Sequence, residues 1–244
     1  MRLKRWPRLW RRPALDPLAH LEAHLLEVRD LAALSRALGW TAPPLLEGHP
    51  LDQFRYWEDL NDRPLRDAEV LGAACRNAAG ATLLEIGTGE GVSTALMAVN
   101  APQATVYTVN IPPEEAAGGG RLITAAPNRE TIGRCYRERG LTNVRQIFAD
   151  TRRWKPDLGP IDVAFIDGCH DEDFVYRDSL LVLAHLAPGG LILWHDFDPS
   201  RRRVFGWIDE VCRALDRLYH ERRLTEPLLH VRDSWIGLYR AQKP

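Results

Sequence analysis

Short apolar runs alternate with segments of helical spacing along most of the chain. Five runs have the length and composition of buried strands, at 83–86, 105–111, 144–150, 161–167 and 191–196. Apolar spacing and flanking glycines and prolines predict helices at 92–98, 129–139, 171–186 and 203–222. Pro188-Gly189-Gly190 is expected to close the third of these helices. Strands that alternate with helices predict a parallel sheet covered by helices on both faces.

Two further apolar stretches end the chain, at 228–231 and 235–239, with Arg232-Asp233-Ser234 between them. A link this short favours a hairpin, in which the two strands run antiparallel. We therefore predict an α/β fold: a doubly wound, mostly parallel, seven-stranded Rossmann-like sheet with an antiparallel last strand.

The N-terminal part precedes this sheet. Apolar residues from 17 to 38 recur every three or four positions, and Pro17 and Gly39 suit a helix start and stop. We expect one amphipathic helix there, which covers the main domain, forms a homodimer contact or lids the substrate pocket. A second helix is predicted at 64–79. The expected division is a basic arm with a helical extension at 1–63, and the main domain at 64–244.

Composition and charge narrow the function classes. The chain has 244 residues and a net charge of −1, so nothing global favours nucleic acid or an anionic membrane. Residues 1–12 hold six basic residues and two tryptophans, typical either of an arm that touches RNA or a membrane or of a loosely docked terminus. The four cysteines lie far apart, which favours reduced thiols in a cytoplasmic protein. We expect neither a signal peptide nor a membrane-spanning helix.

Three glycines at alternate positions, Gly87, Gly89 and Gly91, connect the first strand of the main domain to its helix. Glycine permits a sharp turn and lets a ligand approach the backbone, and a helix start offers free N–H groups. Glu85, at the end of the strand, can accept hydrogen bonds from the ligand or from the loop. The spacing differs from the dinucleotide fingerprint, and the Gly-Lys-Ser/Thr of a phosphate-binding loop is absent.

Polar residues also stand at or next to the carboxyl ends of the other predicted strands. They are Asn110, Asp150, Asp167 and the pair His195-Asp196. Ligands of open α/β sheets bind at this edge, so we expect these side chains to converge on one site. A helix-capping role is the alternative for any single one of them.

The run Glu85-Ile86-Gly87-Thr88-Gly89-Glu90-Gly91 resembles motif I of class I S-adenosylmethionine-dependent methyltransferases. The resemblance implies S-adenosylmethionine as cofactor, bound by Glu85, Gly87, Thr88, Gly89, Gly91, Ser93, Asn110, Asp150 and Asp167. In that family an acid usually holds the ribose hydroxyls where this chain has Asn110. An amide forms weaker hydrogen bonds than a carboxylate, so we expect weaker cofactor binding or help from Glu114 or Glu115.

A second resemblance rests on Phe165-Ile166-Asp167-Gly168-Cys169-His170, Pro188-Gly189-Gly190 and Trp194-His195-Asp196. These segments are similar to methyltransferase family 24, the branch with macrocin and catechol O-methyltransferases. The branch implies a divalent cation, Mg²⁺ or Mn²⁺, held here by Asp167, His195 and Asp196. His195 stands where the branch more often has an acid, and imidazole suits Mn²⁺, Fe²⁺ or Zn²⁺ better than Mg²⁺.

The catalytic candidates are His170, His195 and Asp167. His170 is the candidate base, with a supporting or helix-start role as its alternative; without a metal, His195 itself could be the base. The expected activity is methyl transfer to a hydroxyl of a sugar or small natural product. An RNA or protein methyltransferase that uses the basic arm is one alternative. A methyltransferase-like binding protein without catalysis, consistent with Asn110 and Cys169, is the other.

Overall fold

The computed structural model describes residues 17–46, 63–78, 80, 82–118 and 128–242. Its strands are β1 (Leu25–Val28), β2 (Thr82–Ile86), β3 (Thr105–Asn110), β4 (Val144–Phe148), β5 (Ile161–Ile166), β6 (Leu186–Trp194), β7 (Leu228–Val231) and β8 (Gly237–Arg240). The α-helices are α1 (Ala19–Glu22), α2 (Leu31–Leu38), α3 (Arg63–Arg76), α4 (Val92–Asn100), α5 (Arg134–Glu138), α6 (Glu172–Leu183) and α7 (Gly206–His220). Two short 3₁₀ helices are η3 (Pro113–Gly118) and η4 (Pro199–Arg201).

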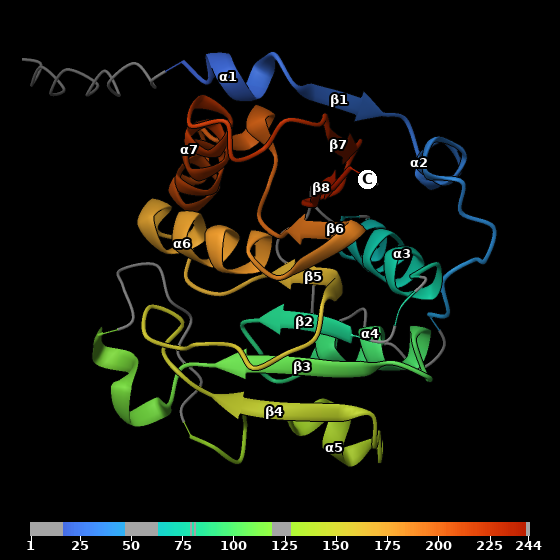
Figure 1. The fold of residues 1–244 in the computed structure, drawn as a ribbon, viewed down its shortest axis with the longest axis vertical. Helices are drawn as coiled ribbons and strands as arrows, with labels where there is room; N and C mark the ends of the chain where they lie inside the picture. Colours follow the sequence, from blue (N-terminus) through green and yellow to red (C-terminus); the bar gives the residue numbers. More distant parts are fainter. Residues whose placement is uncertain (1–16, 47–62, 79, 81, 119–127, 243–244) are drawn as a thin grey trace, which may run out of the picture.

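All the described strands form one sheet, in the order β1-β7-β8-β6-β5-β2-β3-β4. Strands β2 to β6 pair in parallel, and β8 runs antiparallel to both β6 and β7. The arrowheads of β2, β3 and β4 consequently end at the same edge of the sheet (Figure 1). This confirms the predicted doubly wound, mostly parallel sheet with its antiparallel last strand.

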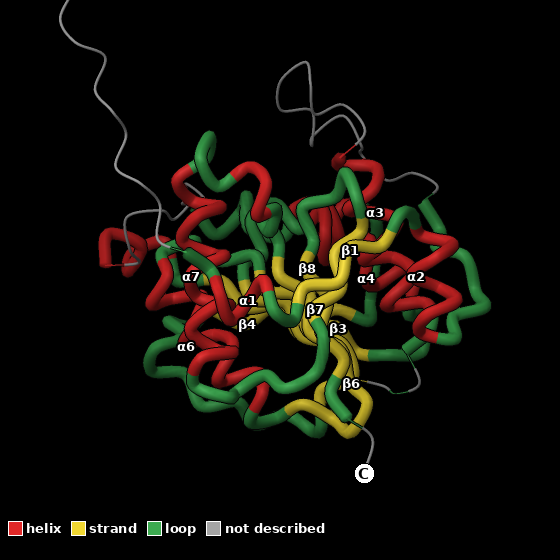
Figure 2. The backbone as a smooth tube through the Cα atoms, turned by 90° about the horizontal axis from the view of Figure 1, so that it is seen from above, coloured by secondary structure: helices red, strands yellow, loops and turns green. Residues whose placement is uncertain are grey.

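Helices cover both faces of the sheet. Viewed from above, α1, α6 and α7 lie on one side of the strands and α2, α3 and α4 on the other (Figure 2). Neighbouring residues of β2 pack into the hydrophobic cores on opposite faces of the sheet. Leu84 packs on the side of α6 and α7, whereas Leu83 packs on the side of α3 and α4. Both side chains are fully buried. The continuous apolar runs of the sequence reflect this burial on both faces.

The prediction of one helix from 17 to 38 is wrong. The segment contains α1, then strand β1, then α2. Strand β1 pairs in parallel with β7, from Leu25 beside Leu228 to Val28 beside Val231, so tertiary pairing overrides the helical spacing. Asp30 then caps α2 by accepting a hydrogen bond from Ala33 N, and α2 stops at Gly39 as predicted. The sheet therefore has eight strands, one more than expected.

Two other element predictions need correction. Pro188-Gly189-Gly190 does not close a helix; α6 ends earlier, at Leu183, and these residues belong to β6, which pairs with β5 through a register shift. The helix expected at 129–139 is reduced to α5. Gly133 interrupts it with a φ of 72° because its N–H donates to the carbonyl of Gly89. That segment is shaped by its contact with the glycine loop.

The expectations for the basic arm at 1–12 fall outside the described residues. Among the helices that the structure does describe, none combines the length and the apolar character needed to cross a lipid bilayer.

Candidate active site

The glycine loop lies between β2 and α4. Gly87, Gly89 and Gly91 have φ values of 101°, 50° and 82°, in the left-handed region that favours glycine. A Cβ on Gly87 would lie 2.0 Å from the carbonyl oxygen of Asp167, and one on Gly91 would lie 2.8 Å from Gly133 Cα. A Cβ on Gly89 would meet no protein atom within 4 Å. Two glycines are therefore enclosed by protein, and the middle one borders open space where a ligand can approach.

The loop is fixed from outside by backbone and side-chain contacts. Gly133 N donates to Gly89 O at 3.0 Å, and Cys135 N donates to Glu90 O at 2.8 Å. At the tip of β3, Asn110 accepts a hydrogen bond from Gly89 N through Oδ1 at 3.2 Å. Asn110 is therefore next to the loop, as expected for a residue at this edge. Its predicted contact with a ribose stays a prediction.

Glu85 is fully buried at the end of β2. Its carboxylate accepts hydrogen bonds from the hydroxyls of Ser93, Thr94 and Thr108, each at 2.5 Å. Thr88, in the loop, contacts the Thr108 hydroxyl at 2.7 Å. Burial raises the pKa of Glu85 to about 7, although the three hydroxyl hydrogen bonds oppose this shift. Glu85 thus joins β2, β3 and α4 beneath the loop. Its predicted contact with the cofactor stays a prediction.

Replacing Glu85 with glutamine is expected to flatten part of the pH dependence of stability. The pKa of Glu85 is about 7 in the fold against an ordinary 4.5. Between pH 4.5 and about pH 7 the folded protein therefore keeps a proton on Glu85 that the unfolded chain has released. The contribution of Glu85 to the unfolding free energy consequently falls as the pH rises through this window. The fall is on the order of 3 kcal/mol. Urea unfolding at pH 5 and pH 8 measures it.

The control for this test is Glu90→Gln, which removes an exposed carboxylate from the same loop. We expect the stability difference between wild type and Glu85→Gln to change with pH, and to change more than the difference for Glu90→Gln. Parallel pH profiles for wild type and Glu85→Gln would show that Glu85 does not titrate in this window.

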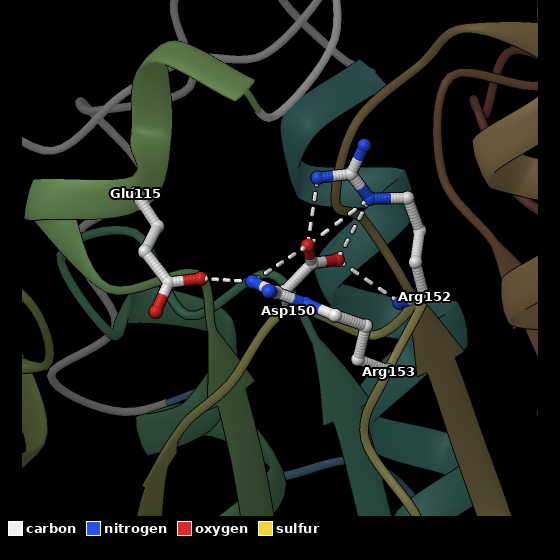
Figure 3. Close-up of a pocket in the computed structure, with 4 residues that line it drawn as sticks. All are labelled: Glu115, Asp150, Arg152 and Arg153. Atoms are coloured by element: carbon white, nitrogen blue, oxygen red, sulfur yellow. Dashed lines mark hydrogen bonds and ion pairs between the residues drawn. The ribbon is translucent and has the colours of Figure 1, made fainter.

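Beyond β4, a hollow of about 590 Å³ is lined by Glu115, Asp150, Arg152 and Arg153 (Figure 3). Arg152 donates to both carboxylate oxygens of Asp150, at 2.7 to 3.1 Å, and lowers the pKa of that carboxyl. Arg153 lies 3.4 Å from Asp150 and also pairs with Glu115 of η3. Asp150 is thus in a pocket at the predicted edge. Sequence reasoning missed the two arginines, although they follow Asp150 almost directly.

Four polar side chains converge at the ends of β5 and β6. Asp167 and His170 follow β5, and His195 and Asp196 follow β6. His170 Nε2 lies 2.7 Å from Asp196 Oδ2 and 3.6 Å from Asp167 Oδ1. His195 Nδ1 lies 3.2 Å from Asp167 Oδ1 and 3.4 Å from Asp196 Oδ2. We call these four residues the Asp-His cluster; the structure brings together all the predicted catalytic and metal residues.

Opposite charges dominate the electrostatics of the Asp-His cluster. Burial disfavours the charged form of each histidine, but Asp196 and Asp167 outweigh it and raise the pKa of His170 to about 10. The same carboxylates raise the pKa of His195. Against the effect of burial, the two histidines lower the pKa values of Asp167 and Asp196. The cluster therefore favours imidazolium and carboxylate forms.

The donor set also fits a divalent cation. Asp167, His170 and Asp196 each offer one ligand atom, and these atoms lie within 4.8 Å of one another. Carboxylate oxygens suit hard cations, and an imidazole nitrogen shifts the preference toward Mn²⁺, Fe²⁺ or Zn²⁺. His170 takes the third place in this group, where the sequence analysis named His195. His195 Nδ1 approaches the same two carboxylate oxygens, at 3.2 and 3.4 Å.

Two neighbours of the cluster were not anticipated. Asp67, on α3, places Oδ2 at 3.5 Å from His195 Nε2. Trp207 donates to Asp196 Oδ1 at 3.1 Å. Asp196 itself has a φ of 54°, a left-handed conformation that is strained for a residue other than glycine and is frequent at functional sites. For Asp67 a signal existed: it is an acid on the same helical face as the apolar residues Leu71 and Ala74.

The Asp-His cluster and the glycine loop are direct neighbours. Asp167 N donates to Ile86 O at 2.8 Å, and the Asp167 carbonyl oxygen occupies the position where a Cβ of Gly87 would project. The start of the glycine loop therefore lies directly against the backbone of the Asp-His cluster. The arrangement suits a reaction between a bound nucleoside-type cofactor and a polar group held by the cluster.

Comparison with known proteins gives a family match and similar folds. Residues 84–197 match the family model of a methyltransferase domain, methyltransferase family 24. A search of curated proteins found no match. Similar solved structures include the O-methyltransferase NovP, with a TM-score of 0.55 and 15% identity over 71% of this chain and 80% of that one. The S-adenosylhomocysteine-bound methyltransferase PaMTH1 of Podospora anserina has a TM-score of 0.53 and 18% identity over 93% of both chains.

A third similar structure is the N-methyltransferase NodS of Bradyrhizobium japonicum WM9. Its TM-score is 0.51 and its identity 14%, over 82% of this chain and all of that one. At such identities the likeness concerns the fold alone. Because one fold here serves both oxygen and nitrogen acceptors, the acceptor has to be argued from the site.

Proposed function

We propose that the methyl acceptor of this chain is a hydroxyl of a small molecule such as a sugar or natural product. The premise is that residues 84–197 form a class I S-adenosylmethionine-dependent methyltransferase domain. The observation that carries this proposal is the position of the Asp-His cluster directly beside the glycine loop. Carboxylates at the methyl-transfer position can bind a hydroxyl and accept its proton, and imidazolium groups can donate hydrogen bonds to the hydroxyl oxygen.

The cofactor would lie along the sheet edge, from the cluster to the hollow beyond β4. In this arrangement the backbone at Gly89 meets the cofactor, and Asn110 faces the ribose. The adenine enters the hollow beside Asp150, where the Asp150 carboxylate is already held by Arg152. The methyl-bearing sulfur would then point toward Asp167.

Methyl transfer to a hydroxyl is a displacement in which the O–C bond forms as the S–C bond breaks. The hydroxyl proton leaves to a base, and the products are a methyl ether and S-adenosylhomocysteine. The ionised Asp167 is the base in reach; His170 and His195, the other catalytic candidates, are held as imidazolium by the carboxylates and act as bases only once they have lost a proton. Alignment of oxygen, methyl and sulfur by fixed side chains supplies much of the rate.

A divalent cation, Mn²⁺ or Mg²⁺, fits the same cluster. Asp167, Asp196 and an imidazole, from His170 or His195, would hold it. When bound, such an ion lowers the pKa of the acceptor hydroxyl and orients the oxygen. The chain's own contribution is to hold the acceptor next to the glycine loop and to keep carboxylates and imidazoles in place.

The test of this proposal separates cofactor from acceptor. Calorimetry with S-adenosylhomocysteine is expected to give a dissociation constant in the micromolar range, typical of a cofactor site. Incubation with methyl-labelled S-adenosylmethionine, Mn²⁺ and a panel of sugars, phenols, amines and RNA is expected to label a hydroxyl compound. Absence of S-adenosylhomocysteine binding by the folded protein would refute the cofactor site, and labelled RNA or amine would refute the hydroxyl acceptor.

A further inference from the structure

The carboxylate of Asp150 is bound on both oxygens by the arginine that follows it two positions later in the sequence. Arg152 Nε lies 2.9 Å from Oδ1 and 3.1 Å from Oδ2, and another guanidinium nitrogen, Nη2, lies 2.7 Å from Oδ2. The backbone N–H of Arg152 also donates to Oδ1, at 3.0 Å. Arg153 lies 3.4 Å from Oδ2, and the Asp150 side chain is 3% exposed. A carboxylate has about four lone-pair positions, so these protein donors already occupy the acceptor capacity of Asp150.

Arg152 is the lining residue that can offer the hollow a fixed, flat surface. All four residues that line the hollow are charged, and none of the four has an aromatic ring (Figure 3). The guanidinium of Arg152 is planar, turns one edge to Asp150, and places Cζ 5.1 Å from the centre of the Phe174 ring of α6. Its side chain is still 34% exposed. With one edge and one side engaged, the opposite face is the part that a ligand in the hollow can reach.

Arg153 lines the same hollow but is held differently. Its side chain is 71% exposed, and its guanidinium pairs with Glu115 of η3 and lies 3.4 Å from Asp150. In the described part of the chain no aromatic ring is recorded against it, in contrast to Phe174 beside Arg152. Arg153 therefore serves as a matched comparison for Arg152: it has the same chemistry, in the same hollow, without the same support.

We propose that Arg152 recognises the adenine of the cofactor by stacking its guanidinium on the face of the base, and that Asp150 is a positioning residue that holds this guanidinium in place. Planar guanidinium groups stack well on aromatic faces, and a group already fixed by hydrogen bonds loses little entropy when it does so. The proposal rests on the proposed function, because it takes S-adenosylmethionine as the ligand of the hollow. It gives Asp150 an indirect role, whereas a carboxylate with an open oxygen would accept a hydrogen bond from the adenine amino group.

Two ligands distinguish stacking from recognition of the amino group in the wild-type protein. Calorimetry compares S-adenosylhomocysteine with its analogue that carries purine in place of adenine and so lacks only the amino group. Stacking uses the face of the base, so we expect dissociation constants within about threefold of each other. If the amino group donates to Asp150, loss of a hydrogen bond to a charged group weakens binding by about tenfold or more, and this result would overturn the proposal. Absence of binding by both ligands would refute the cofactor site itself, and the proposal with it.

Substitution of each arginine provides the second test. Arg152→Ala is expected to raise the dissociation constant for S-adenosylhomocysteine about 10- to 100-fold, as is typical when a stacking partner of a base is lost. Arg152→Lys keeps a cation beside Asp150 but has no planar face, so it is expected to lose most of the same affinity. The control, Arg153→Ala, is expected to stay within about threefold of wild type. Wild-type affinity in folded Arg152→Ala or Arg152→Lys would overturn the proposal, and the lysine variant answers the question if the alanine variant does not fold.

A double-mutant cycle tests the indirect role of Asp150. Asp150→Asn is expected to weaken S-adenosylhomocysteine binding, because an amide holds the guanidinium less firmly than a carboxylate. The double variant Asp150→Asn/Arg152→Ala is expected to bind no more weakly than Arg152→Ala, since Asp150 has nothing left to position. Losses that multiply in the double variant would show that Asp150 meets the base independently of Arg152, which contradicts the proposal. Urea unfolding of each variant confirms that the affinities belong to folded protein.

Discussion

Replacing Gly89 with valine is expected to abolish cofactor binding while the protein still folds. Gly89 has a φ of 50°, and a Cβ there would project into open space, where no protein atom lies within 4 Å. A valine side chain would fill the volume through which the cofactor meets the backbone. We expect the dissociation constant for S-adenosylhomocysteine to rise about 100-fold or more, a loss of about 3 kcal/mol. Isothermal calorimetry measures the change.

Backbone strain has to be separated from this steric effect. A β-branched residue with positive φ costs on the order of 1–3 kcal/mol wherever it stands. Gly140 is the matched control, because it has a φ of 65° and a Cβ there would also meet nothing within 4 Å. Gly140→Val is expected to lose comparable stability and keep its affinity for S-adenosylhomocysteine. Wild-type affinity in folded Gly89→Val would place the cofactor elsewhere.

The central sheet was predictable because its signals are local. Continuous apolar runs such as 163–166 mark strands buried on both faces, and the glycines at 87, 89 and 91 mark a turn with positive φ. The segment 17–38 was not predictable in this way. Its periodicity fits a helix, and only pairing with β7, some two hundred residues later, makes its middle a strand. Pairing over such a distance leaves no trace in local spacing.

The same contrast between local and long-range signals applies to the candidate site. The strand-end rule placed Asp167, His195 and Asp196 together, and the structure confirms that they meet. The rule could not assign partners within the cluster, where the short contact of Asp196 is to His170. Nor could it find Asp67, which reaches the site from a helix rather than from a strand end.

Removing the two carboxylates of the cluster is expected to have the largest effect on turnover. In Asp167→Asn/Asp196→Asn the histidines lose the charges that hold them, and neither position can bind a cation as a carboxylate does. We expect kcat for methyl transfer to fall by about 10²–10⁴-fold, the range that general acid–base catalysis supplies. The affinity for S-adenosylhomocysteine is expected to change much less than kcat, because Asp167 meets Gly87 of the glycine loop through its backbone carbonyl.

The experiment needs variants that report on folding and on metal separately. Breaking a buried ion pair costs about 3–5 kcal/mol of stability. Asp196 contacts His170 at 2.7 Å, so Asp196→Asn is expected to destabilise the fold more than Asp167→Asn. Asp167 is 28% exposed, and Asp167→Asn alone is expected to fold and to lose most of the activity. Asp198→Asn, a buried acid that caps η4, is the matched control.

Comparing activity with and without a chelator then distinguishes two roles of the same carboxylates. If a cation binds to the cluster, EDTA is expected to lower kcat of the wild type toward that of Asp167→Asn, and Mn²⁺ to restore only the wild type. Wild-type turnover that survives EDTA, combined with an inactive Asp167→Asn, would assign the carboxylates to holding the acceptor and the histidines without metal. Full activity of the folded double variant would show that the cluster takes no part in the reaction. If these charged groups bind the acceptor at the methyl-transfer position, their removal has to lower turnover.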